Sequence, residues 1–325
     1  LKIGRKWVSP PYNVDGWRLD VAADLGYGEE MNHQFWRDFR TAVKEANPEA
    51  IILAEHYDDP REWLEGDQWD TVMNYNAFME PVTWFFTGME KHSDEKRSDL
   101  LGNTRAFLDS MMYHMSRFQY PSLLVSMNEL SNHDHSRFLT RTNQTVGRTE
   151  SMGPEAADAN VNKGIMRAAV MLQMTWPGAP TLYYGDEAGV TGWTDPDNRR
   201  TYPWGHEDQG LIEYHRKMIR IHKEHEALLT GSLKYLEGAY KVICYGRFTA
   251  REKMVVLING GFDEAKVRVP VWEIGVTEEE ELQRIIMSRE ADFTLEPAVC
   301  PVQGGVLEIT LPAITAILLK AVPKK

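Results

Sequence analysis

The chain of 325 residues carries 36 Lys and Arg against 48 Asp and Glu, a formal net charge of −12, and 42% of its residues are hydrophobic. Nucleic-acid binding relies on clustered cations that displace phosphate counterions, so this acidic balance disfavours a nucleic-acid partner. The sequence has no apolar run of about eighteen residues, which disfavours a membrane span, and its length favours a large domain with a smaller one.

Short apolar runs alternate with helical patterns in the first two thirds of the chain, as in βα units around a parallel sheet. Buried strands are predicted at residues 16–20 (GWRLD), 50–55 (AIILAE), 71–75 (TVMNY), 122–127 (SLLVSM) and 181–185 (TLYYG). Apolar residues at helical spacing predict helices through 35–43, over about 160–176 and over about 210–229. Residues 1–229 are therefore expected to form part of a parallel α/β fold.

From about Thr230 the pattern changes to alternating segments such as KVICYGRF, KMVVLING and TAILLKAV, separated by turn residues. This period of two predicts a separate antiparallel β domain over residues 230–325. The only cysteines, Cys244 and Cys300, exclude a disulfide framework and a four-thiolate zinc site. We expect two unlinked thiols in a reducing compartment, although one bond between them stays open.

The first predicted strand ends in a charged pair. Side chains alternate along a strand, so Arg18 and Asp20 point to one side while Trp17 and Leu19 point to the other. A guanidinium this close favours the ionised carboxylate, which a nucleophile or electrostatic stabiliser needs. The alternative is a buried ion pair with a structural role.

A second carboxylate, Glu55, ends the next strand. Parallel strands bring their carboxyl ends to one rim, where βα barrels keep their active sites, so Glu55 is expected near Asp20. The apolar residues Ile51 to Leu53 lead into Glu55, and apolar surroundings are typical of a general acid. A solvent-facing loop residue next to His56 is the alternative.

The fourth predicted strand is followed by the polar run NHDHSR, residues 132–137, which supplies a third carboxylate, Asp134. Turn chemistry, or a metal bound by His133 and His135, would also account for this run. Metal ligation is disfavoured because no HExxH, no CxxC and no third spaced ligand accompanies the two histidines.

Paired carboxylates that flank a sugar acetal carry out glycoside hydrolysis, one as acid and the other as attacking group. Aromatic rings near the predicted rim could stack on sugar rings, and Tyr57, Trp193 and Trp204 are the candidates because of their places in polar loops. Each of them could equally be a core residue.

At these residues the sequence resembles the α-amylase superfamily, and within it the cyclomaltodextrinase, neopullulanase and maltogenic amylase group. GWRLDVA is similar to the segment with the nucleophile and its Arg partner, here Asp20 and Arg18. ILAEHYDDPREWLEGDQWDTVMNY resembles the segment with the acid/base, Glu55, and its GDQ and VMNY parts resemble that group in particular.

Three later segments continue the resemblance. NHDHSRFLT is similar to the segment with the transition-state-stabilising carboxylate, Asp134, and its sugar-binding neighbour His133. GAPTLYYGDEAGV and DPDNRRTYPW resemble the last barrel strand and the loop after it, which puts the implied glucose contacts on Asp195 and Arg199. Tyr57 is added as a substrate-binding candidate.

The resemblance implies an α-glucan hydrolase that retains the α-anomer through a covalent intermediate on Asp20, with its two carboxyls about 5 to 5.5 Å apart. The expected substrates are maltooligosaccharides, cyclomaltodextrins or pullulan, cleaved at α-1,4 and perhaps α-1,6 bonds. Transglycosylation by the same site, or an inactive fragment with a binding role, are the alternatives. No cofactor is implied in this chain.

Two departures qualify the resemblance. Relatives have T-P-R where this chain has His135-Ser136-Arg137, and the segment AADLGYGEEMNH after Asp20 is longer here, which leaves bond preference open. The fold class expected is a partial (β/α)8 TIM barrel, strands four to eight, followed by an antiparallel β-sandwich. We expect the family's first motif, and any calcium site, to lie in a missing N-terminal part. A half-barrel exposes parallel strand edges, so the chain is expected either to pair with another copy as a homo-oligomer or to be weakly active or inactive on its own.

Overall fold

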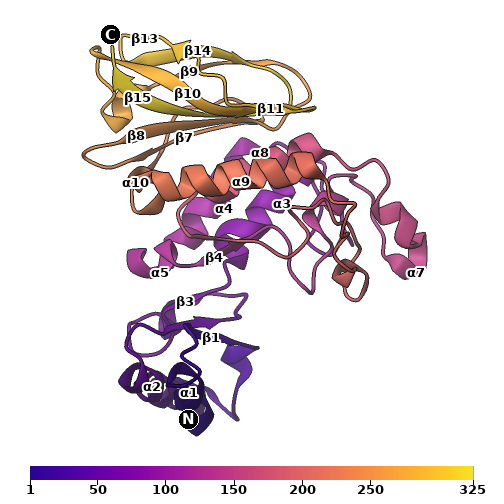
Figure 1. Cartoon of the computed structure of the whole chain (residues 1–325), viewed down its shortest axis with the longest axis vertical. Coiled ribbons are helices and arrows are strands. Elements are labelled where there is room, and N and C mark those ends of the chain that lie inside the picture. Colours follow the sequence, from indigo (N-terminus) through magenta and orange to yellow (C-terminus); the bar gives the residue numbers. More distant parts are fainter. Residues whose placement is uncertain (325) are drawn as a thin grey trace. The chain divides into compact units, whose positions relative to one another are not determined.

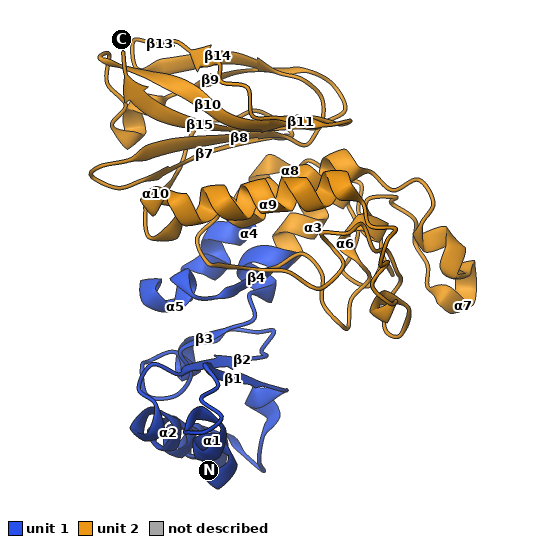
Figure 2. Ribbon diagram, viewed as in Figure 1, with its two compact units in different colours: residues 1–79, 110–128 blue, residues 80–109, 129–325 orange. Residues whose placement is uncertain are grey.

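The computed structural model describes residues 1–324, and the chain divides into two compact units (Figure 2). Unit 1 comprises residues 1–79 and 110–128, and unit 2 comprises residues 80–109 and 129–325. Unit 1 contains the segments predicted to hold the nucleophile and the acid/base, whereas unit 2 contains the NHDHSR run and the strand-rich C-terminal segment (Figure 1). The expected domain boundary at residue 229 stays a prediction.

A parallel sheet forms the centre of unit 1. Its strands are β1 (Gly16–Leu19), β2 (Ile51–Ala54) and β3 (Thr71–Val72), in that order. The predicted strands at 16–20 and 50–55 are confirmed, whereas the one at 71–75 is a strand only over its first two residues. In the register of β1 and β2, Arg18 lies opposite Leu53 and Leu19 lies opposite Ala54. A parallel bridge between Met73 and Met127 leads on to β4 (Met127–Glu129).

Two helices cover one face of this sheet. They are α1 (Lys2–Val8) and α2 (Glu29–Ala46), and α2 extends the helix predicted through residues 35–43 in both directions. Trp36, Phe39 and Val43 on α2 pack with Ile52 and Ala54 of β2 in one hydrophobic core. Because side chains alternate along β2, Leu53 points to the other face, where it packs with Met73 and Tyr75.

Two strands were predicted at the wrong positions in the chain, residues 122–127 and 181–185. Residues 120–124 form the helix α5 (Tyr120–Leu124), with Pro121 in its first turn, and the strand β4 begins only at Met127. Short apolar runs do not distinguish a strand from a buried helical turn, and proline suits the start of a helix. Likewise, β5 spans Ala179–Thr181, so most of the predicted 181–185 strand lies beyond it.

Unit 2 contains the longest helices outside α2. The predicted helices over 160–176 and 210–229 correspond to α8 (Lys163–Thr175) and to α9 (Gln209–Glu224) with α10 (Glu226–Leu229).

The remaining helical elements before residue 230 belong to both units. They are η1 (Ala22–Asp24), η2 (Arg61–Trp63), η3 (Tyr75–Met79), α3 (Glu80–Thr87), α4 (Thr104–Met115), α6 (Phe138–Arg141), α7 (Thr149–Met152), η4 (Pro154–Ala157) and η5 (Asp197–Arg199).

Antiparallel strands dominate the chain after residue 230. They are β6 (Ser232–Tyr235), β7 (Val242–Phe248), β8 (Lys253–Asn259), β9 (Ala265–Val269), β10 (Glu280–Ser288), β11 (Phe293–Thr294), β12 (Val299–Cys300), β13 (Val302–Gln303), β14 (Val306–Leu311) and β15 (Thr315–Pro323), with η6 (Val271–Ile274) between β9 and β10. A seven-stranded sheet and the three-stranded sheet β13-β14-β9 share one hydrophobic core. Figure 1 shows these strands beyond α8 and α9 of the same unit.

Two composition-based expectations concern the whole chain. Cys244 and Cys300 are both free thiols, which confirms the expectation of unlinked cysteines. Across residues 1–324, no helix combines the length and the apolar character needed to cross a membrane.

The Glu252 carboxylate ties α10 to the C-terminal sheet. It accepts hydrogen bonds from the Ala227 N–H at 3.0 Å, from Lys320 Nζ at 2.8 Å and from His225 Nδ1 at 2.6 Å. Burial alone would raise the pKa of Glu252, but the bonds from Lys320, Ala227 and His225 outweigh burial and lower the pKa from 4.5 to about 2. The folded state therefore favours the ionised form.

We predict that Glu252→Gln lowers the free energy of unfolding at pH 7 by about 2 kcal/mol, because hydrogen bonds to a charged acceptor are lost. A depressed carboxyl pKa contributes stability above the unfolded-state pKa, and this contribution disappears as the pH falls from about 4.5 to about 2. Urea unfolding at a series of pH values should show the deficit shrinking across that window. The exposed Glu237→Gln serves as control, and a pH-independent deficit would contradict the prediction.

Candidate active site

The predicted nucleophile and acid/base follow neighbouring strands of unit 1. Asp20 comes directly after β1 and Glu55 directly after β2, and the Glu55 N–H continues the sheet by donating to the Leu19 carbonyl at 2.8 Å. Parallel pairing therefore brings both carboxylates to one edge of the sheet, as the sequence predicts.

One guanidinium contacts both carboxylates. Arg18 Nη1 is hydrogen-bonded to Asp20 Oδ1, and Arg18 Nη2 lies 3.2 Å from Glu55 Oε2. The Val21 N–H also donates to Glu55 Oε2 at 3.0 Å. The Asp20 side chain is 77% exposed and the Glu55 side chain 12% exposed, so Asp20 is open to a ligand while Glu55 is enclosed.

The two neighbouring carboxylates keep Arg18 positively charged. Partial burial of Arg18 would lower its pKa, but the hydrogen bond to Asp20 and the negative charges of Glu55 and Asp20 outweigh that effect and raise the pKa. The guanidinium therefore stays protonated and supplies a fixed positive charge between the carboxylates.

Tyr57 lies next to this group, in the loop after Glu55. Its ring stacks in parallel on Tyr75, with centroids 4.0 Å apart, and its carbonyl accepts a hydrogen bond from Asn76. Tyr57, Tyr75 and Asn74 line a cavity of about 200 Å³. Because Tyr75 covers one face of the Tyr57 ring, a ligand cannot stack on that face. Tyr75 was missed as a site residue, although the TVMNY segment contains it.

A buried amide shapes the segment after Asp20. Asn32, which is 3% exposed, places its Nδ2 within 3.0 Å of the carbonyls of Ala22, Ala23 and Leu25. Its Oδ1 accepts from Trp63 Nε1 at 2.8 Å. One side chain of α2 thus fixes both the turn that follows Asp20 and the segment that follows Glu55. No sequence motif indicated this role.

Unit 2 brings together the other predicted site residues. His133 Nε2 lies 3.5 Å from Asp134 Oδ2, and Arg199 Nε lies 2.8 Å from Asp195 Oδ1. Arg199 Nε also donates to the His133 carbonyl at 3.2 Å, which joins the two loops. The four side chains are each partly exposed, as a ligand-binding set requires.

A buried polar network supports these two loops. Asn198 Nδ2 donates to the carbonyls of Asn132 and His135, and Asn132 Oδ1 accepts from the Asp134 and His135 N–H groups. Arg137, fully buried, pairs with Asp186 at 3.0 Å. The Arg of T-P-R is kept here as Arg137, a buried structural cation behind the loop, so the departure is confined to His135 and Ser136.

Three sequence-based candidates have different outcomes. Trp193 is fully buried and donates from Nε1 to the Gly153 carbonyl, so its prediction as a surface stacking ring is wrong. Trp204 is 80% exposed and lies beside Tyr202, as a stacking ring would. The third candidate is His135, one of the two histidines considered as metal ligands. Its burial, and to a smaller extent the positive charge of Arg141, lower the pKa of its ring to about 2, so the ring is neutral.

The family is decided by the match to known catalytic domains. Residues 1–271 match the family described as "Alpha amylase, catalytic domain". The chain belongs to the alpha-amylase family. The match confirms the resemblance predicted from the sequence motifs. The chain has a catalytic-domain region followed by a C-terminal sheet domain.

Two curated relatives illustrate the similarity. A cyclomaltodextrinase of Thermoanaerobacter pseudethanolicus is 36% identical over 261 residues, covering 80% of this chain and 39% of the relative. Neopullulanase 2 of Thermoactinomyces vulgaris is 34% identical over 279 residues, covering 84% of this chain and 41% of the relative. The alpha-amylase family chain thus spans less than half the length of these relatives.

Among solved structures, the native debranching enzyme of Nostoc punctiforme superposes with a TM-score of 0.77 at 27% sequence identity. The superposition covers 98% of this chain and 60% of that enzyme. The fold of this alpha-amylase family chain is therefore shared with that debranching enzyme over nearly the whole length of this chain.

We predict that Asn32→Ala loosens the turn after Asp20 in this alpha-amylase family chain, because up to three carbonyls and the Trp63 N–H lose their partner. Leaving buried polar groups unsatisfied should lower the free energy of unfolding by about 2 to 4 kcal/mol. Hydrogen exchange should accelerate in residues 21–28 more than in β7 and β8. Gln34→Ala, on an exposed position of the same helix, is the control, and unchanged exchange in residues 21–28 would refute the role.

Proposed function

We propose that this chain carries the catalytic pair of a retaining α-glucan hydrolase, with Asp20 as nucleophile and Glu55 as general acid/base. The observation that supports it most is the contact of Arg18 with both carboxylates at the edge of β1 and β2. Retaining enzymes need closely spaced carboxyls, about 5 to 5.5 Å apart, whereas inverting enzymes space them by about 6.5 to 9.5 Å. Two carboxylates held by one guanidinium favour the closer arrangement.

In the proposed reaction, Glu55 protonates the leaving glycosidic oxygen while Asp20 attacks the anomeric carbon and forms a covalent glycosyl ester. Water then attacks that carbon from the face that the leaving group has vacated, opposite Asp20, Glu55 takes its proton, and the Asp20 carboxylate leaves. The product keeps the α-configuration because two inversions occur.

Arg18 suits both stages of this cycle. Before the reaction Asp20 is the anion and Glu55 carries the proton, whereas in the intermediate Asp20 is esterified and Glu55 is the anion. One negative charge is present at each stage, and Arg18 contacts both groups that carry it. A fixed cation that does not need to reorganise stabilises charge most effectively.

The remaining predicted residues take supporting roles in the proposal. Asp134 stabilises the positive charge of the transition state, and His133, Asp195 and Arg199 bind the sugar together with Tyr57 and Arg18. The carboxyl chemistry needs no cofactor.

The substrate proposal rests on the relatives. Their names, cyclomaltodextrinase and neopullulanase, point to α-1,4-linked cyclomaltodextrins, maltooligosaccharides or pullulan, and the solved debranching enzyme leaves α-1,6 bonds open.

We predict that Asp20→Asn abolishes hydrolysis of maltotriose and of β-cyclodextrin, with a loss of at least about 10⁴-fold, because the amide cannot form the ester. Asp24→Asn, an exposed carboxylate close by in sequence, should retain the activity. NMR of the first product should show the α-anomer, and a β-anomer as first product would contradict retention.

We predict that Glu55→Gln slows hydrolysis by an amount that depends on whether the leaving group needs a proton. Hydrolysis of maltotriose needs protonation of the leaving oxygen and should fall by about 10² to 10⁴-fold. An α-maltosyl fluoride needs no such protonation, so its first turnover should be far less affected. Equal losses on both substrates would argue against Glu55 as the acid.

A further inference from the structure

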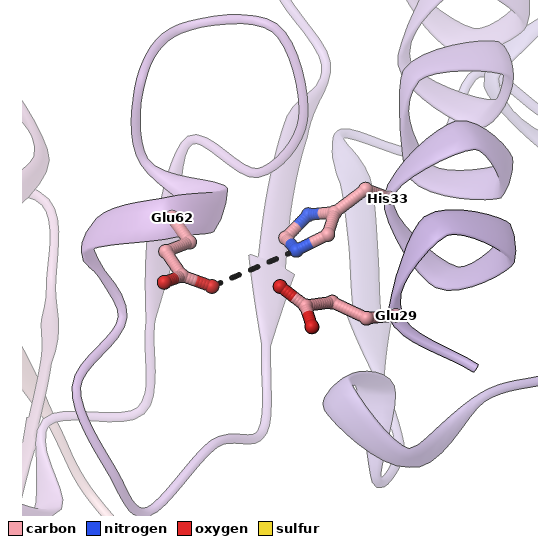
Figure 3. A group of neighbouring side chains, drawn as sticks. All are labelled: Glu29, His33 and Glu62. Atoms are coloured by element: carbon pink, nitrogen blue, oxygen red, sulfur yellow. Dashed lines mark ion pairs between the residues drawn. The ribbon is translucent and has the colours of Figure 1, made fainter.

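A second polar group of unit 1 lies outside the carboxylate pair. Glu29 and His33, four residues apart on α2, project from one face of that helix, and Glu62 of η2 faces them across a short gap (Figure 3). One ligand atom from each residue can be chosen so that all three lie within 4.8 Å of one another. His33 Nε2 lies 3.7 Å from Glu62 Oε2.

His33 is oriented from outside this group by a buried amide. Its Nδ1 lies 2.8 Å from Oε1 of Gln68, which is 1% exposed. Gln68 Nε2 donates to the Glu62 carbonyl at 3.0 Å, which leaves Oε1 as the acceptor toward His33. The Nδ1 of His33 therefore carries a proton, and in the neutral ring the lone pair of Nε2 points at the carboxylates.

The ring of His33 is also held by packing. It stacks on Trp63, with centroids 4.9 Å apart and an interplanar angle of 28°. A histidine fixed through Nδ1 by a neighbouring amide or carbonyl, with its Nε2 free, is the arrangement of metal-ligating histidines.

We propose that Glu29, His33 and Glu62 bind a divalent transition-metal ion of the Zn²⁺ class. One imidazole nitrogen and two carboxylates suit zinc, with water in the fourth position, whereas Ca²⁺ and Mg²⁺ prefer oxygen ligands alone. Zn–N and Zn–O bonds of about 2.0 to 2.2 Å at tetrahedral angles place ligand atoms about 3.4 Å apart. The His33–Glu62 separation is close to that value, and small rotations of the exposed Glu29 bring in the third ligand.

A similar group in unit 2, Glu90, His92 and Asp94, differs because its side chains already have partners. Glu90 accepts from the backbone and ring nitrogens of His92, and Asp94 is paired with Arg148. Its ligand atoms are therefore already engaged, and His92 directs Nδ1 at Glu90 instead of an outside acceptor. Only the Glu29–His33–Glu62 group combines a histidine fixed from outside with two carboxylates, among the described residues.

The position of the ion gives it a function. It would join the start of α2, after the segment that follows Asp20, to η2, in the segment that follows Glu55. Asn32 and Trp63 already link these two segments through one hydrogen bond. The bound metal is therefore a removable cross-link between the segments after the two carboxylates, and this inference does not depend on the proposed hydrolysis.

The test uses the full chain, stripped of metal with a chelator and titrated with Zn²⁺ in a calorimeter. The double variant E29Q/E62Q removes both carboxylate ligands, and E30Q/E65Q makes the same charge change at exposed neighbouring positions in the same segments. We expect one equivalent of Zn²⁺ to bind wild type and E30Q/E65Q alike. Binding to E29Q/E62Q should be at least about tenfold weaker, and H33N should behave in the same way.

Two further readouts decide the geometry and the cross-link. Co²⁺ in place of Zn²⁺ should give the visible absorption of a four-coordinate site in wild type and lose it in E29Q/E62Q. Zn²⁺ should also slow hydrogen exchange in residues 21–28 and 56–63 of wild type and of E30Q/E65Q. Binding that is equal in all variants, or no binding to wild type, would overturn the proposal and leave an ion pair between His33 and Glu62.

Discussion

A guanidinium on β1 touches the carboxylates that follow two neighbouring parallel strands, and the other contacts described in unit 1 surround that pair. Arg18 reaches Asp20 on its own strand and Glu55 on the next because the register places Arg18 opposite Leu53. Alternation along the strands then sends Ile52 and Ala54 to the helix-covered face, and leaves Arg18 with Met73 on the other face. One sheet thus separates a hydrophobic core from a charged surface.

The segments that leave this sheet are fixed by a second layer of contacts from α2. Asn32 holds the turn after Asp20 and accepts from Trp63, and His33 stacks on the same tryptophan while Gln68 fixes its ring. Consecutive residues of one helix therefore hold the segments that follow Asp20 and Glu55.

Much of this organisation could be predicted from the sequence, because periodic burial sets the strands β1 and β2 and the helix α2. The 122–127 strand was wrong because a short apolar run after a proline also suits a helical turn. The contacts of Asn32, and of His33 with Gln68, could not be predicted, since they join residues far apart in sequence through single hydrogen bonds. Motif resemblance pointed to the carboxylates and to Arg18, but it carried no information on Asn32 and Gln68, which hold the segments after them.

The central claim is that Asp20 becomes covalently bonded to the substrate while Glu55 does not. A 5-fluoro-α-glucosyl fluoride slows the hydrolysis of such an intermediate, so that the glycosyl group stays on the nucleophile and can be located by mass spectrometry of peptides. The account predicts one added sugar on the peptide that contains Asp20, and none on the Asp20→Asn variant. A label on the peptide that contains Glu55, or on neither peptide, would contradict it.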